Sequence, residues 1–187
     1  MKKPLAYDPG RGIPPQERSR RKKLGEAMLA FIKFLFEGGK DDEVMREVRL
    51  ENYREVVEEA AAHGIETSLT WHVLGSWSND GPDRIACFTR ALACVESHRD
   101  DHLHLPGPLK DWTETHTRAD CLYEIGRIHA HEGNPAIARD FLARALPLSQ
   151  EAERLRAPAN ITTEDNLEGR IASLLLQLPD PDDPATD

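Results

Sequence analysis

Apolar side chains recur at steps of three and four residues along most of the chain, which is the spacing of one face of an α-helix. The clearest example runs from Asp120 to Leu148, where a Gly133-Asn134-Pro135 sequence interrupts the pattern. One apolar face precedes the interruption and a second follows it: Leu122, Ile125, Gly126 and His129, then Ala138, Phe141, Leu142 and Ala145. The pattern predicts two short amphipathic helices that pack as a hairpin, with small residues allowing the backbones to approach closely.

Similar stripes predict helices over the rest of the chain. The expected limits are residues 15 or 16 to 38, 41 or 42 to 64, 66 or 67 to 78, 82 to about 96, 111 to about 132, 134 to about 156, and 162 or 163 to 178. Asp111 and Glu114 have the spacing of a capping box, so the fifth helix is expected to begin at Asp111. Period-two alternation is missing from the sequence, which therefore predicts an all-α fold, an array of antiparallel helix hairpins with about seven helices and no sheet.

Proline and glycine set the expected domain limits. Residues 1–15 are rich in both and predict an extended N-terminal arm, whereas residues 16–178 carry the periodic stripes and predict one helical domain. Residues 179–187 combine prolines with aspartates and predict a disordered acidic tail.

The formal net charge of −9 is unevenly distributed. Residues 1–23 carry eight Lys and Arg against Asp8 and Glu17, a local charge of +6 that leaves −15 for residues 24–187. An acidic body repels nucleic acid, so no nucleic-acid partner is expected. The basic run at 18–23 is either a solvated helix end or a contact for an acidic partner. The glutamates of residues 43–59 form either a solvated helix face or an acidic patch for a basic partner.

Hydropathy and cysteine content bear on the expected location. The apolar segment at residues 27–36 contains Lys33 and is shorter than the ~18 residues that a membrane span needs. We therefore expect neither a membrane segment nor a secretion signal, and a cytoplasmic protein. Cys87, Cys94 and Cys121 fall within helical patterns and are expected to be buried free thiols, as in a reducing compartment.

Few residues suggest catalysis or metal binding. His98, His102 and His104, with Asp100 and Asp101, are the best candidate zinc cluster, but a Cys-x-x-Cys pair is missing and incidental loop histidines are the favoured interpretation. The sequence also lacks a nucleophile elbow and a phosphate-binding loop. We expect no cofactor, no metal and no enzymatic activity.

The hairpin at residues 119–148 resembles a tetratricopeptide repeat in its order of large and small positions. Trp71, Leu74 and Gly75, followed by a glycine turn and by the Ile85, Phe88, Ala91 and Leu92 stripe, resemble a second repeat of this kind. The two matches begin 51 residues apart, at Trp71 and Leu122, where the family has 34. The resemblance implies an array of helix pairs whose open end is covered by the last helix.

The resemblance also implies a function and a binding surface. Members of the family bind protein or peptide partners, so it implies a non-catalytic adaptor or scaffold. In the family, the first helix of each pair lines the concave face. The matching positions here are Asp120, Tyr123, Arg127, Ala130 and His131 in one repeat and Leu69, His72, Ser76 and Asn79 in the other. Neither stripe has the combination of Lys and Asn with which some members hold the terminal carboxylate of a peptide. We therefore expect a different ligand, recognised by an aromatic ring, a guanidinium and apolar contacts.

Other interpretations of the same sequence remain open. Tyr123 and Arg127 can instead cover a neighbouring helix or pair with Glu124 or Asp120. The acidic charge also suits an inhibitor or immunity-type protein that masks a basic partner. A third alternative is an enzyme whose site is assembled from scattered residues.

Overall fold

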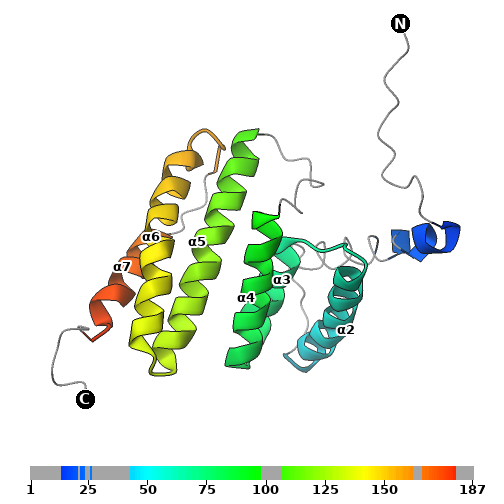
Figure 1. The fold of residues 1–187 in the computed structure, drawn as a ribbon, viewed down its shortest axis with the longest axis horizontal. Coiled ribbons are helices and arrows are strands. Elements are labelled where there is room, and N and C mark those ends of the chain that lie inside the picture. The colour runs from blue at the N-terminus through cyan, green and yellow to red at the C-terminus, as the bar shows by residue number, and fades with distance from the viewer. Residues whose placement is uncertain are drawn as a thin grey trace, which may run out of the picture. The chain divides into compact units, whose positions relative to one another are not determined.

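The computed structural model describes residues 14–20, 22–23, 26, 43–97, 107–161 and 166–179. Residues 15–20 are helical, and six longer helices follow (Figure 1): α2 (Glu43–Ala62), α3 (Ser68–Trp77), α4 (Gly81–Glu96), α5 (Gly107–His131), α6 (Pro135–Arg156) and α7 (Leu167–Gln177). These ranges contain no strand, so the predicted all-α class is confirmed.

The chain divides into two compact units between Ile65 and Glu66. The first contains α2, which buries Val57 and Ala60 and exposes Glu55, Glu58 and Glu59. An ion pair between Arg20 and Glu59 joins residues 15–20 to α2. The predicted helical domain, residues 16–178, spans both units.

Helices α3 to α7 form the second unit, in which each helix packs against the next one along the chain. The local sequence explains where two of these helices begin. The Thr67 side chain accepts a hydrogen bond from the Thr70 backbone N–H at 3.1 Å and caps α3, and Asp80 accepts one from the Asp83 N–H at 3.1 Å and caps α4. Pro82, predicted to be the first residue of this helix, is the second residue of α4, still within the first turn, where its missing N–H has no cost.

Helices α5 and α6 form the predicted antiparallel hairpin. The chain turns at Gly133, whose φ of 77° lies in the left-handed region that favours glycine. Helix α6 lies close to Gly126 of α5, where a Cβ would lie 3.0 Å from Leu142 Cγ and 3.2 Å from the Ala138 carbonyl oxygen. A side chain at this position would therefore require Leu142 and the α6 backbone to shift by a few tenths of an ångström.

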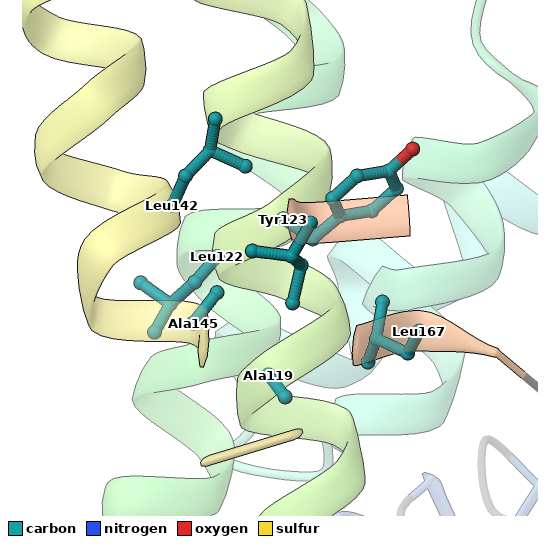
Figure 2. Packing of buried hydrophobic residues seen from close by; sticks show 7 residues of the cluster. Ala119, Leu122, Tyr123, Leu142, Ala145 and Leu167 are labelled. Carbon is teal, nitrogen blue, oxygen red and sulfur yellow. The ribbon is translucent and has the colours of Figure 1, made fainter. Parts of the chain in front are cut away.

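The α5–α6 hairpin shares a core with α7. Leu142 and Ala145 of α6 and Leu167 of α7 lie on opposite sides of α5 in Figure 2. Between them lie Leu122 and Tyr123, and Ile171 of α7 completes this buried cluster. The last helix therefore contributes side chains to the core of the unit.

Two predicted helix starts are wrong. Helix α5 begins at Gly107, and Asp111 lies inside it, because Pro108 is compatible with a first helical turn and the helix continues upstream of the capping-box pattern. The cap of α7 is Asn166, which accepts a hydrogen bond from the Gly169 N–H at 3.0 Å. The predicted caps, Thr162 and Thr163, lie outside the described residues.

Some other predictions also fall outside the described residues: the arm up to residue 13, the histidine cluster at 98–104 and the segment 180–187. None of the described helices combines the length and the apolar character that a membrane crossing requires.

Candidate functional site

The two predicted binding stripes meet where α3 packs beside α5. His72 of α3 donates a hydrogen bond from Nε2 to Asp120 Oδ2 of α5 at 2.6 Å. The His72 ring also packs against Phe88 of α4 in an edge-to-face arrangement, with ring centroids 5.5 Å apart. This packing fixes the imidazole, so the pair joins α3 to α5.

The surroundings of Asp120 stabilise its charged form. Burial alone would raise the pKa of this carboxyl group, but the His72 hydrogen bond and the positive charges of His72, His116 and Arg170 outweigh burial and lower the pKa below the ordinary 3.8. The Arg170 guanidinium lies 3.7 Å from Asp120 Oδ1, so this carboxylate also connects α5 to α7.

A second carboxylate, Glu124, lies one helical turn further along α5 and holds two arginines. Its Oε2 accepts hydrogen bonds from Arg84 of α4 at 3.1 Å and from Arg127 at 2.6 Å. Arg84 also donates from Nε to the Gly75 carbonyl oxygen of α3 at 3.2 Å. The hydrogen bond to Glu124 is the main reason why the pKa of Arg127 is raised above its ordinary value.

Tyr123 lies between these carboxylates in the sequence, and α7 covers it. Its side chain belongs to the core cluster and is only 8% exposed. The Arg170 guanidinium carbon lies 5.0 Å from the centroid of the Tyr123 ring, a cation–π contact. Figure 2 shows the hydroxyl end of Tyr123 pointing away from Leu122 and the α6 residues.

An open pocket of about 380 Å³ lies between α5 and α7. Its lining residues are Tyr123, Arg127, Asn166, Gly169, Arg170, Ser173, Leu174 and Gln177. Two arginines and no carboxylates line it, although residues 24–187 are acidic as a whole. Its side chains can bind an anionic group by hydrogen bonding and can contact an apolar group at Leu174.

The structure divides the predicted site residues into three groups. His72 and Asp120 are hydrogen-bonded to each other, and Tyr123 and Arg127 line the pocket. The remaining residues are outside the pocket lining: Leu69 and Ala130 are half-buried, and Ser76, Asn79 and His131 are exposed. The alternative pairing of Arg127 with Glu124 is present, as is the packing of Tyr123 against a neighbouring helix.

Sequence analysis missed the contribution of α7 and the role of Glu124 as a shared acceptor. Arg170 and Ser173 lie between the apolar positions of α7, whereas the prediction of this helix used only its apolar stripe of Ile171, Leu174, Leu175 and Leu178. The available signal was the interruption of an apolar stripe by an arginine and a serine. It does not identify a partner helix, however, so it could not place these side chains beside Tyr123.

The cysteines are free and buried, as predicted. Burial raises the pKa of Cys121 well above its ordinary value, with smaller contributions from Asp120 and Glu124. A thiol with a raised pKa is a poor nucleophile at neutral pH. Within the part of the chain that the structure describes, no group of His, Cys, Asp or Glu is arranged to hold a metal ion.

No protein-family model matches the chain, and the searches of curated proteins and of solved structures found no significant similarity either.

Proposed function

We propose that this protein is a non-catalytic interaction module, an adaptor or scaffold that binds a protein or peptide partner on the face shared by α3, α5 and α7. The observation that carries the proposal is the pocket between α5 and α7, where an aromatic ring, two guanidiniums and a leucine are gathered. Tyrosine and arginine are among the residues enriched at binding hot spots. The resemblance to tetratricopeptide repeats supports the same face, because α3 and α5 contain the matching first helices.

The polar contacts beneath this face favour a preformed surface. Helices α3, α4, α5 and α7 are connected through Asp120 and Glu124, whose side chains are only 16% and 15% exposed. A surface held in place before binding loses less conformational entropy when the partner docks.

Position-specific photocrosslinking in lysate of the source cells tests the proposal. A benzophenone amino acid is placed at Ser173, inside the pocket, and at Ser76, on α3; the control position is Ala143, an exposed residue of α6. We expect one protein to crosslink from Ser173 and Ser76 but not from Ala143. Equal crosslinking from all three positions, or crosslinking from Ala143 alone, contradicts the proposed face.

Masking of a basic partner is the second candidate, favoured by the exposed glutamates Glu55 and Glu58 of α2. A photocrosslinker at Glu58 would then capture the partner, and binding would weaken steeply as salt is added, because exposed charge pairs are screened. The affinity for a partner that binds through α3, α5 and α7 should depend less on salt concentration.

A further inference from the structure

We infer that the pocket between α5 and α7 binds an acidic segment of the partner, with an Asp or Glu side chain between Arg127 and Arg170 and an apolar neighbour on Leu174. This inference rests on the proposed function and specifies the chemistry of the partner. Its starting point is the contrast between a pocket lined by two arginines and the acidic remainder of the chain.

The arginines are positioned by carboxylates that lie deeper than they do. Asp120 and Glu124 are about 16% exposed or less, whereas Arg127 and Arg170 are 38% and 43% exposed. The carboxylates therefore orient the guanidiniums from below, and the guanidiniums provide the outer surface.

Arg127 keeps donors for a ligand. Glu124 accepts from its Nε at 3.2 Å and from its Nη2 at 2.6 Å, which uses two of the five N–H groups of a guanidinium. The remaining donors suit a carboxylate, since arginine binds this group in a planar, often bidentate geometry.

The local charge favours an anionic group. Three arginines, Arg84, Arg127 and Arg170, are grouped with two carboxylates, Asp120 and Glu124, so arginines outnumber carboxylates among these five side chains. A negatively charged side chain of the partner complements this excess.

The pocket has the length of a short peptide. Its lining runs from Asn166 to Gln177, along the 11 residues of α7, which span about 16 Å. An extended chain advances by ~3.3 Å per residue, so about five residues fit. Leu174, which is half-buried, offers an apolar contact beside the arginines, so an apolar residue next to the acidic one completes the expected ligand.

A capped heptapeptide library tests this inference on the full-length protein. The probes are acetylated and amidated, so they have no terminal charges, and their central residue is Asp, Glu, Asn, Gln, Lys or phosphoserine beside a fixed Leu. We expect Asp or Glu peptides to bind about tenfold more tightly than the Asn and Gln peptides, and this preference to disappear in Arg170→Gln and Arg127→Gln. Arg154→Gln is the matched control, because this arginine is exposed on α6 and pairs with Glu151.

The possible results separate this inference from the proposed function. In one outcome, neutral or basic peptides bind as tightly as acidic ones at a site that the crosslinker at Ser173 blocks. This result overturns the acidic ligand and agrees with the proposed interaction module. The acidic ligand is also overturned if none of the peptides binds, or if the phosphoserine peptide binds more tightly than the Asp and Glu peptides. A further contrary result is an Arg170→Gln variant that keeps the preference for acidic peptides while its circular dichroism spectrum is unchanged. If deletion of residues 180–187 strengthens Glu-peptide binding tenfold, the Asp-rich end of this chain occupies the pocket, and a partner segment is the wrong occupant.

Discussion

At the residue scale, the Asp120 side chain connects three helices. It accepts a hydrogen bond from His72 of α3 and lies close to Arg170 of α7, while it is itself part of α5. A buried carboxylate is stable only when such partners offset the cost of desolvation. The residue was predicted as a partner contact, and the structure shows that it joins three helices.

Replacing Asp120 by Asn should lower stability in a pH-dependent way. At pH 7 we expect the free energy of unfolding to fall by about 2 kcal/mol, because the charge that strengthens the His72 hydrogen bond and the Arg170 ion pair is removed. Since the pKa of Asp120 is lower in the folded protein than its ordinary 3.8, the charged form stabilises the fold above pH 3.8. This contribution is lost as the pH falls through the folded-state pKa.

Urea unfolding of both proteins between pH 3 and pH 7 measures this effect. The difference between wild type and Asp120→Asn should be full at pH 5 to 7 and should shrink below pH 3.8. The control is Asp140→Asn, since Asp140 is exposed and forms a surface pair with Arg144 at 3.6 Å. A difference that is constant from pH 3 to pH 7 would show that the charge of Asp120 does not contribute.

At the scale of elements, α6 continues through Pro147 to Arg156, as predicted. A proline inside a helix removes one backbone hydrogen bond and crowds the preceding turn. Packing of both halves of the helix compensates: Leu142 and Ala145 precede the proline, and Ser149 and Ala152 follow it, all of them buried. Tertiary contacts thus hold together a helix that local preference would interrupt.

Replacing Pro147 by Ala should therefore stabilise the protein. The side chain is exposed, so little packing is lost, and alanine restores the N–H and relieves the crowding. We expect a gain of about 1–3 kcal/mol, measured as a rise in melting temperature of ~2–4 °C for each kcal/mol.

Pro82→Ala is the matched control for this substitution. Pro82 lies in the first turn of α4, where proline is well tolerated, so no gain is expected. A lower melting temperature for Pro147→Ala would mean that proline helps mainly by restricting the unfolded chain.

At the scale of the whole molecule, the contacts that build the candidate site all lie within residues 66–187. The core cluster of α5, α6 and α7, the His72–Asp120 pair and the pocket belong to this unit. The cap of α3 at Thr67 and the hydrogen bond from Trp71 Nε1 to Glu66 at 2.8 Å are also contained in it.

A fragment of residues 66–187 should therefore fold on its own. We expect a helical circular dichroism spectrum and a cooperative thermal transition. Ile171→Ala, which creates a cavity in the core cluster, should destabilise this fragment by about 2–5 kcal/mol. A fragment that melts without cooperativity, or a melt that Ile171→Ala leaves unchanged, would show that residues 1–65 are required for this core.

The sequence by itself determined the elements. Periodicity of three and four residues predicted α3 and the α5–α6 hairpin, because the buried face of an amphipathic helix requires apolar residues at this spacing. Gly126 and the turn at Gly133 were predictable for the same reason: close helix contact and a left-handed turn each favour glycine. The start of α5 could not be predicted in this way, since a capping-box pattern can also occur inside a helix.

Only the tertiary structure decided which faces meet. His72 and Asp120 are 48 residues apart in the sequence, and Arg84 and Glu124 are 40 apart. Periodicity defines a face of one helix but carries no information about the helix that covers it. The pocket depends on this missing information, because Arg170 and Ser173 acquire a role only when α7 packs beside Tyr123 and Arg127.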